Sequence, residues 1–375
     1  MNKISNKRII VSVTNDLFTD QRVKKICDSL IKLNYEVLLV GRLLNQNKEL
    51  IRDYKCIRMH LYFNKGVLFY AEYNIRLLFI LLFSRVDIFH ANDLDTLMAN
   101  YIASKIRNKP IVYDSHEYFT GVPEIQNKPI VKIIWTKIEK SIFPKLKFIF
   151  TVNDSIARLY KKKYGKNLTV MRNIPNPIKL VRFKSKSELK IPLDKDIIIT
   201  QGAGINVDRG TEELVEAMKY LENVCLLILG DGDVIPQLKK RVKELELENC
   251  IMFKKRMSYE KMIQHTNHAQ IGLSLDKDSN INYKYSLPNK IFDYIHSNTP
   301  ILASKLPEIE KIVSGYGIGI FIDNHKPKHI ADKIKFMIKN KRLNTKWKKN
   351  LKHAAKELIW DNEAKSLKEI YSKIG

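Results

Sequence analysis

Arg8-Ile-Ile-Val-Ser-Val13 begins the pattern that decides the fold. A short β-branched run of this kind predicts a buried strand. Residues 20–33 have the apolar spacing of an amphipathic helix that closes near Asn34, and a second strand follows at Tyr35-Glu-Val-Leu-Leu-Val40. A strand, a helix and a strand in this order predict two parallel strands joined by a crossover helix.

The same alternation continues along most of the chain, with one interruption. It breaks around Asn173-Ile-Pro-Asn-Pro177, and the basic stretch that runs on to Leu193 has no clear period, so we expect an interdomain linker there. The fold class is therefore α/β, with two Rossmann-like, doubly wound parallel-sheet domains that face each other across a cleft. The further strands are expected at 87–91, 111–113, 148–152, 197–200, 224–229, 250–253, 271–275 and 300–303.

The chain has 375 residues with 45% hydrophobic content, which is too long for a domain with one ordinary hydrophobic core. Its length therefore supports two domains. We expect an N-terminal domain over residues 1–178 and a C-terminal domain over 179–345. Helices at 346–375 follow; they either cross back onto the N-terminal domain or cap the second one.

The net charge of +26 predicts a surface that attracts polyanions. The lysines are spread over both halves with no nucleic-acid-binding module, so no nucleic-acid partner is expected. An anionic membrane surface fits better. An aromatic and basic segment at 62–70 leads into the apolar run Leu77–Phe83, which is too short to span a bilayer. A helix buried against a sheet is the favoured interpretation of that run, and membrane contact is the alternative.

The N-terminus goes from polar and basic residues directly into a strand, without the apolar core of a signal peptide. The four cysteines lack metal-binding spacing and are expected to be reduced, mostly buried thiols. Both features predict a cytoplasmic protein, and the net charge favours a peripheral position on the inner face of the plasma membrane.

A loop that leads into a helix at Tyr283-Lys-Tyr-Ser-Leu-Pro-Asn-Lys-Ile-Phe-Asp-Tyr-Ile-His296 has the features of an anion site. Pro288 has a helix-compatible φ, and Asn289 is expected to cap. The amides of the first turn would face an anion beside Lys290, while Asp293, one turn deeper, could accept hydrogen bonds from sugar hydroxyls. An ordinary helix start beside a solvated lysine is the alternative.

Two strand-to-helix turns, at residues 14–22 and 201–210, lack the G-x-G-x-x-G fingerprint, which argues against nicotinamide or flavin binding. In the second turn, Gly202, Ala203 and Gly204 would let a ligand approach the backbone. Arg209 could clamp a diphosphate with its planar fork, or pair with a neighbouring acid. The turn Gly230-Asp-Gly-Asp233 lies where ligands of such sheets collect.

The order of these motifs resembles retaining glycosyltransferase family 4, whose members have two Rossmann-like domains. The resemblance rests on Gln201-Gly-Ala, Asp208-Arg-Gly, Leu229-Gly-Asp-Gly, Leu287-Pro-Asn-Lys-Ile-Phe-Asp-Tyr and Leu306-Pro-Glu-Ile in the second half, and on Thr19-Asp-Gln-Arg22, Asn92-Asp-Leu-Asp95 and Tyr113-Asp-Ser-His-Glu117 in the first. The match therefore covers most of the chain.

The resemblance implies roles for individual residues. His116 matches the family's active-site histidine, with a satisfied buried histidine as the alternative. Arg209 and Lys290 match residues that hold the donor diphosphate, and Asp293 matches the second acid of the E-x7-E motif, which binds ribose hydroxyls. The expected donor site comprises Gly204, Arg209, Gly232, Tyr285, Ser286, Asn289, Lys290 and Asp293.

Two departures from the family bear on activity. The first acid of the E-x7-E motif falls on Tyr285, and an arginine that many members carry falls on Ala203. The D-x-D triplets at 93–95, 194–196, 231–233 and 276–278 resemble the metal grip of a different glycosyltransferase fold, but such triplets arise easily among 40 acidic residues. We expect no metal and no cofactor besides the co-substrate.

The resemblance implies transfer of a sugar from a nucleoside diphosphate donor to a glycan or lipid-linked acceptor in surface polysaccharide biosynthesis. Attack would come from the front face of the sugar, and the leaving phosphate would take the acceptor proton. A nucleotide-sugar epimerase of the same architecture is one alternative. A nucleotide-sugar-binding pseudoenzyme that acts as a scaffold is the other.

Overall fold

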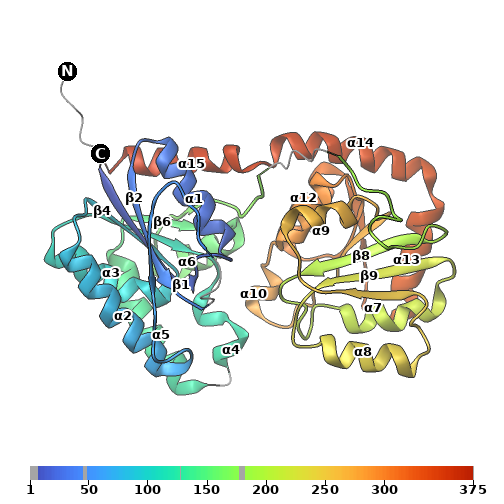
Figure 1. Ribbon diagram of the computed structural model, residues 1–375, viewed down its shortest axis with the longest axis horizontal. Helices are drawn as coiled ribbons and strands as arrows, with labels where there is room; N and C mark the ends of the chain where they lie inside the picture. The colour runs from blue at the N-terminus through green and yellow to red at the C-terminus, as the bar shows by residue number, and fades with distance from the viewer. Residues whose placement is uncertain (1–6, 45–48, 127, 177–181, 375) are drawn as a thin grey trace. The chain divides into compact units, whose positions relative to one another are not determined.

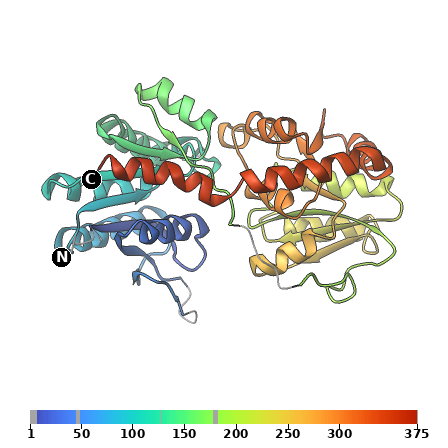
Figure 2. The ribbon, with the colours of Figure 1, turned by 90° about the horizontal axis from the view of Figure 1, so that it is seen from above.

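The computed structural model describes residues 7–44, 49–126, 128–176 and 182–374, and the chain forms two compact units (Figure 1). Unit 1 comprises Met1–Asn173 and Trp360–Gly375, and unit 2 comprises Ile174–Ile359. The boundary expected between residues 178 and 179 lies outside the described residues. The segment expected at 346–375 is divided, because α14 (Lys341–Glu357) belongs to unit 2 and α15 (Trp360–Ser372) to unit 1 (Figure 2).

Unit 1 is built on a parallel sheet with the strand order β3-β2-β1-β4-β5-β6-β7. Alternate residues of β1 enter two different cores: Ile9 packs with the helices α1 and α15, whereas Ile10 packs with α2 and α3. The sheet is therefore covered on both faces. The strands are β1 (Arg8–Asp16), β2 (Glu36–Arg42), β3 (Lys55–Met59), β4 (Ile88–Asn92), β5 (Ile111–Ser115), β6 (Phe148–Thr151) and β7 (Thr169–Val170), and the helices are α1 (Gln21–Lys32), α2 (Gly66–Phe83), α3 (Leu94–Ile106), α4 (Pro123–Gln126), α5 (Pro129–Ile142) and α6 (Asp154–Tyr164).

Unit 2 has a second parallel sheet, in the order β10-β9-β8-β11-β12-β13, also with a core on each face. Both sheets place strands of low sequence number at the centre, as doubly wound folds do, so the prediction of two Rossmann-like parallel-sheet domains is confirmed. The strands are β8 (Asp196–Gly202), β9 (Val224–Gly230), β10 (Ile251–Lys254), β11 (Ile271–Ser274), β12 (Ile301–Ser304) and β13 (Gly319–Ile322), and the helices besides α14 are α7 (Thr211–Ala217), α8 (Ile235–Glu244), α9 (Tyr259–Thr266), α10 (Ile281–Lys284), α11 (Asn289–His296), α12 (Pro307–Tyr316) and α13 (Pro327–Lys339).

The first helix illustrates how local sequence sets an element. Asp20 is the N-cap of α1 and accepts a hydrogen bond from the Val23 amide, which satisfies one donor of the first turn. After the helix, Asn34 adopts φ 64°, a left-handed conformation that asparagine tolerates well. These two residues fix the helix ends within one residue of the predicted positions.

Helix α2 departs from its expected burial. Tyr73, Leu77 and Leu81 are buried against the sheet, but Phe79 is 59% exposed and Phe83 is 82% exposed. Only 28% of the helix is buried, so the expectation of a buried helix is wrong for its outer face. Among the described helices, α2 is the one with the length and apolar composition to cross a bilayer, a property that core helices can share.

Helix α15 completes the core of unit 1. The Trp360 indole donates to Ser29 Oγ in α1 at 2.8 Å, and the Glu363 carboxylate accepts bonds from the Arg172 backbone and guanidinium. Leu367 is fully buried. The helix therefore fills one face of the first sheet from the far end of the sequence.

Candidate active site

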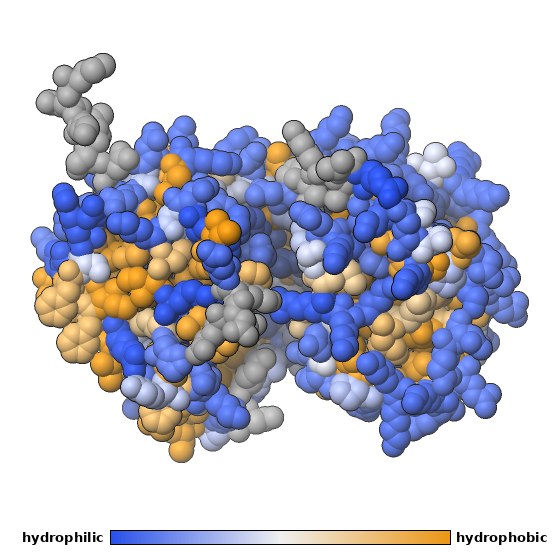
Figure 3. All heavy atoms as spheres, viewed as in Figure 1, coloured by the Kyte–Doolittle hydropathy of each residue, from blue (hydrophilic) through white to orange (hydrophobic). Residues whose placement is uncertain are grey.

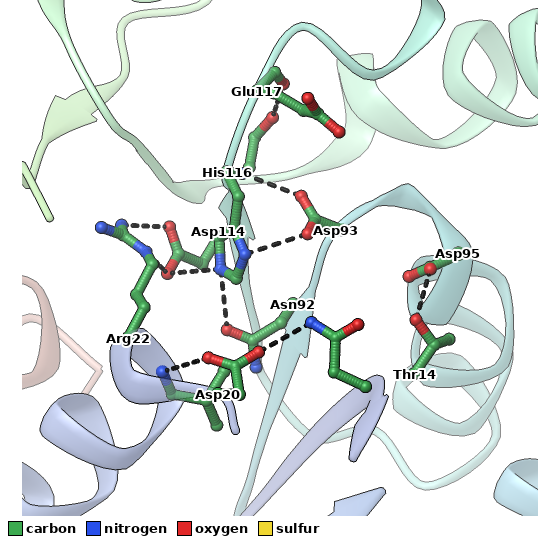
Figure 4. Close-up of polar contacts among 12 residues, drawn as sticks. Thr14, Asp20, Arg22, Asn92, Asp93, Asp95, Asp114, His116 and Glu117 are labelled. Carbon is green, nitrogen blue, oxygen red and sulfur yellow. Dashed lines mark hydrogen bonds and ion pairs between the residues drawn. The ribbon is translucent and has the colours of Figure 1, made fainter. Parts of the chain in front are cut away.

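The carboxyl ends of β4 and β5 carry a buried polar cluster in unit 1 (Figure 4). The two strands are parallel neighbours with Asn92 opposite Asp114, so the residues that follow, Asp93 and His116, lie at the same edge of the sheet. This edge is where open α/β sheets bind their ligands.

His116 is held by two carboxylates. Its Nδ1 lies 2.9 Å from Asp93 Oδ2, and its Nε2 lies 3.3 Å from both Asp114 Oδ2 and Asn92 Oδ1. Burial alone would lower the pKa of His116, but the charges of Asp93 and Asp114 outweigh burial and raise it well above 6.5. The ring is therefore an imidazolium at neutral pH, with both N–H groups directed at acceptors.

The backbone of Asp93, whose side chain contacts His116, is strained. It has φ 58° and ψ 167°, a region that is essentially restricted to glycine. Its Oδ1 also accepts a hydrogen bond from the His116 amide at 2.8 Å. Strain of this kind persists where the surrounding structure fixes the residue, and it concentrates at functional sites.

Asp114 is supported from behind by Arg22 of α1. The guanidinium donates from Nε and Nη2 to both carboxylate oxygens, at 2.9 and 2.7 Å, and from Nη1 to the Met171 carbonyl. Although burial raises the pKa of Asp114, Arg22 and His116 hold it well below its ordinary value. The cluster is thus a chain of alternating charges, in which each buried charge has a partner.

Asp95, at the start of α3, differs from its neighbours because no cation among the described residues forms an ion pair with it. It accepts a hydrogen bond from Thr14 Oγ1 at 2.6 Å. Burial, followed by the charge of Asp93, raises the pKa of Asp95 to about 7. Its carboxyl group therefore titrates near neutral pH.

A second cluster lies at the carboxyl edge of the sheet in unit 2, around the buried carboxylate of Asp276. Arg209 Nη1 donates to Asp276 Oδ1 at 2.7 Å, and Lys290 Nζ lies 3.6 Å from Asp276 Oδ2. Arg209 comes from the turn after β8, Asp276 follows β11, and Lys290 lies in the first turn of α11. Two cations from separate turns thus meet at one carboxylate.

The two cations are partly enclosed. The Arg209 guanidinium stacks over the Tyr283 ring at 4.0 Å, and its side chain is 25% exposed. The Lys290 side chain is 12% exposed; burial, together with the charge of Arg209, lowers its pKa, and Asp276 opposes this shift. Arg209 Nε is buried and has no hydrogen-bond partner among the described residues. With one carboxylate between two cations, the cluster carries a net positive charge.

Asp293 lies on α11 and is nearly buried. Its Oδ1 accepts from the Tyr259 hydroxyl at 2.8 Å and its Oδ2 from the Gln201 amide at 3.1 Å. Gln201 in turn accepts a bond from Thr266. The carboxylate expected to bind ribose is therefore already part of a hydrogen-bond network that fixes its orientation.

The neighbouring sequence-predicted residues have mixed outcomes. Asn289 does not cap α11: the N-cap is Pro288, without a side-chain cap bond, because the helix begins at Asn289, one residue earlier than expected. Tyr285 is the C-cap of α10, and the Ser286 hydroxyl donates to the Tyr283 carbonyl. These two residues shape the loop before α11.

Gly230 and Gly232 allow the turn after β9 to pack closely against the turn after β8. A Cβ at Gly232 would lie 2.0 Å from the Ile205 carbonyl oxygen, and one at Gly230 would lie 1.8 Å from that of Gly202. A Cβ at Gly204, in contrast, would have no atom nearer than Asn206 Nδ2 at 3.8 Å. Close approach of two turns, and not of a ligand, explains Gly232, whereas the space beside Gly204 is open.

Several residues of these clusters were not singled out from the sequence. Asp276 appeared there only as a member of a chance D-x-D triplet, Asp93 in such a triplet and within a motif, and Arg22 and Asp114 only within motifs. Each acid lies within two residues of the carboxyl end of a buried parallel strand, which is the signal that could have found it. Among the described residues, no group of three or more His, Cys, Asp or Glu side chains is placed to hold one metal ion.

Two protein-family models match consecutive parts of the chain. Residues 20–182 match the model described as Glycosyltransferase Family 4, and residues 181–354 match the one described as Glycosyl transferases group 1. Between them they extend from α1 into α14, and so include both clusters.

Solved structures agree on the fold. A sucrose-phosphate synthase from Thermosynechococcus elongatus matches with TM-score 0.82 at 14% identity, covering 98% of this chain and 99% of its own. A glycosyltransferase from Rickettsia africae matches with TM-score 0.76 at 17% identity over 99% of each chain. Anabaena HepE in complex with UDP and glucose matches with TM-score 0.76 at 14% identity, covering 98% of this chain and 100% of its own. The chain therefore belongs to the glycosyltransferases with two Rossmann-like domains, whose halves are described as family 4 and group 1.

Proposed function

We propose that the protein is a retaining glycosyltransferase. It transfers a sugar, without a metal, from a nucleoside diphosphate donor to a glycan or lipid-linked acceptor in surface polysaccharide biosynthesis. The observation that carries this proposal is the convergence of Arg209 and Lys290 on Asp276. Family membership supplies the reaction class, and the cluster supplies the chemistry for a diphosphate leaving group.

The cluster suits a diphosphate because it holds more positive than negative charge in a restricted space. Arg209 donates one hydrogen bond, from Nη1, to Asp276. Its buried Nε has no hydrogen-bond partner among the described residues. Charge-assisted bonds from a guanidinium and an ammonium, held in place before the ligand arrives, stabilise charge that develops on a departing phosphate. This electrostatic support can replace the divalent cation used by other transferases.

The donor is proposed to be a nucleoside diphosphate sugar. Asp293 is oriented by hydrogen bonds from Tyr259 and Gln201, and a carboxylate suits ribose hydroxyls because it accepts the hydrogen bonds that they donate. Solved structures of Anabaena HepE, which shares the fold, contain UDP or UDP-glucose. These observations support a nucleoside diphosphate sugar as the class of donor.

His116 is proposed to act as a fixed positive charge beside the sugar. A ring protonated on both nitrogens has no lone pair, so it cannot accept the proton of the acceptor hydroxyl. In the proposed step, the acceptor oxygen bonds to the anomeric carbon as the bond from that carbon to the phosphate oxygen breaks. The acceptor proton passes to the leaving phosphate, and attack on the same face retains the anomeric configuration.

The acceptor is proposed to be carried at a membrane, with the protein at the cytoplasmic face. The net charge of +26 favours an anionic lipid surface. The scaffold alternative keeps one supporting observation, namely that Tyr285 stands where the family's first motif acid is expected.

Calorimetric titration with a panel of nucleotide sugars, followed by assay of nucleoside diphosphate release, tests the proposal. The expected result is that a nucleotide sugar binds and that nucleoside diphosphate is released at a rate that EDTA does not change. NMR of the product then gives its anomeric configuration. Binding without turnover would instead identify a scaffold. An epimerised sugar would identify an epimerase.

A further inference from the structure

Exposed apolar side chains concentrate on three neighbouring helices of unit 1. Helices α2 and α3 pack together, and α3 packs on α5, on the face of the sheet opposite α1 and α15. Figure 3 shows a broad apolar area in this part of the molecule. We define the α2–α3–α5 face by its exposed members, Val67, Leu68, Ile75, Phe79, Phe83, Met98, Ile102, Ile106, Ile130, Ile133 and Ile134.

The spacing of these residues follows one side of each helix. On α2, Ile75, Phe79 and Phe83 recur every four residues, and the rings of Phe79 and Phe83 stack with centroids 6.3 Å apart. On α3, Met98, Ile102 and Ile106 also recur every four residues. A soluble monomer rarely exposes so continuous an apolar surface, which marks an interaction site.

Charge distinguishes the possible partners of this face. The acids of the three helices are Glu72, Asp95 and Glu139; Asp95 and Glu139 are buried, and Glu72 pairs with Arg76 at 2.7 Å. Exposed cations occur along the same helices and on the residues next to the helix ends. They are Lys65, Arg85, Lys105, Lys128, Lys137 and Lys140.

An apolar surface with a basic border complements a bilayer that contains anionic lipids. Apolar side chains enter the boundary between headgroups and acyl chains, while lysine and arginine remain among the phosphates. The buried inner side of α2 excludes a transmembrane position, because Tyr73, Leu77 and Leu81 are fully buried and the Tyr73 hydroxyl donates to the Val13 carbonyl of β1. The helix can therefore lie in the interface only with unit 1 folded.

We propose that the α2–α3–α5 face docks unit 1 onto an anionic lipid bilayer, with α2 lying in the interface plane and Phe79 and Phe83 inserted. The inference rests on the proposed function in one respect: docking serves the reaction because the proposed acceptor is linked to a lipid. Binding to lipid itself does not require catalysis, so the two can fail separately.

Co-sedimentation with vesicles tests the insertion. The full chain should bind vesicles of phosphatidylglycerol and phosphatidylcholine and bind pure phosphatidylcholine at least tenfold more weakly. The double variant Phe79→Ser/Phe83→Ser should lose about tenfold or more of the binding to anionic vesicles. The matched control is Leu193→Ser/Phe336→Ser, which removes two exposed apolar side chains of unit 2 and should bind as the parent does.

A charge-matched pair separates local basicity from the overall net charge. Lys137→Glu/Lys140→Glu should weaken vesicle binding several-fold, whereas Lys348→Glu/Lys349→Glu, on the exposed side of α14, changes net charge equally and should have a much smaller effect. Equal losses in both pairs would overturn the proposal. So would unchanged binding of Phe79→Ser/Phe83→Ser.

Two further measurements guard against misfolding and a different partner. In Phe79→Trp, the indole fluorescence should shift to the blue with vesicles and be quenched by brominated acyl chains; absence of both changes would contradict insertion. Nucleoside diphosphate release from the donor should be the same in Phe79→Ser/Phe83→Ser and the parent, which shows that the site is intact. Self-association that this variant abolishes, without vesicle binding by the parent, would assign the face to a second copy.

Discussion

Asp93 holds His116 at two points, accepting a hydrogen bond from its backbone amide at 2.8 Å and contacting its ring Nδ1 at 2.9 Å. One carboxylate therefore fixes both the main chain and the ring of the proposed active-site histidine. Because Asp93 adopts a conformation suited to glycine, its side chain and its strain can be separated by substitution.

Asp93→Ala and Asp93→Gly remove the same carboxylate and should both lower turnover by tenfold or more, since the imidazolium loses its oriented partner. The glycine variant relieves the strain at φ 58° and should be more stable than the alanine variant by about 1 kcal/mol. Urea denaturation and donor hydrolysis measure the two effects. Equal stability of the variants would argue against backbone strain.

Arg209→Ala and Lys290→Ala should each weaken the affinity for nucleoside diphosphate by about 1–3 kcal/mol, the range for charge-assisted hydrogen bonds. Titration calorimetry measures this loss. Lys284→Ala serves as the control, because Lys284 is an exposed lysine of the same segment that pairs with Asp278. Unchanged affinity in both test variants would remove the proposed diphosphate site.

His116→Ala should abolish turnover and leave nucleotide affinity nearly intact, because the residue belongs to unit 1 and the diphosphate cluster to unit 2. The raised pKa of His116 adds a spectroscopic prediction. Its imidazole NMR signals should remain those of the protonated ring from pH 6 to pH 8. A titration near pH 6.5 would mean that the Asp93 and Asp114 contacts do not hold in solution.

The raised pKa of Asp95 predicts how stability depends on pH. The folded state binds this proton more tightly than the unfolded chain, where the pKa is 3.8, so this group's contribution to stability is full below about pH 4 and is lost as the pH rises through about 7. Asp95→Asn imitates the protonated carboxyl at every pH, so the stability of this variant does not fall as that carboxyl loses its proton. The free energy of unfolding of the variant, minus that of the parent, should therefore increase from pH 5 to pH 8. A difference that is constant with pH would contradict the assignment.

Two buried tryptophans should report on the two units separately. Trp360 is 2% exposed in the core of unit 1, and Trp347 is 5% exposed in a core of unit 2. Replacing either with alanine should cost about 3–5 kcal/mol. In calorimetric melting, Trp360→Ala should lower the transition of unit 1 and Trp347→Ala that of unit 2. The same shift from both would mean that the units unfold together.

The sequence predicted the fold well because most strands are buried on both faces and have strong apolar runs. Three strands escaped: β7 has only two residues, β3 has a polar pattern, and β13 is a four-residue strand that begins with glycine. The exposure of α2 also escaped. A helix that is apolar on every side does not indicate which side meets the sheet.

Sequence reasoning singled out Arg209, Lys290 and Asp293, but not the acid Asp276 that the two cations contact. Arg209 and Lys290 could be placed from turn chemistry, whereas their contact with Asp276 joins parts of the chain that only the folded sheet brings together. The left-handed conformation of Asp93 likewise depends on its surroundings, since nothing in the local sequence favours it. The residue types in a turn can therefore be interpreted from the sequence, whereas contacts between distant segments require the folded structure.

Lys25 touches both places where the chain passes between the units: its ammonium donates to Asn173 at 2.8 Å and lies 4.8 Å from the centre of the Trp360 ring. A ribosome makes all of unit 2 between these two residues. During synthesis, unit 1 therefore has only α1, without α15, on this face of its sheet core until residues 360–372 emerge, while unit 2 can already fold. This order exposes the nascent first half to chaperones and gives the final helix the last step of maturation.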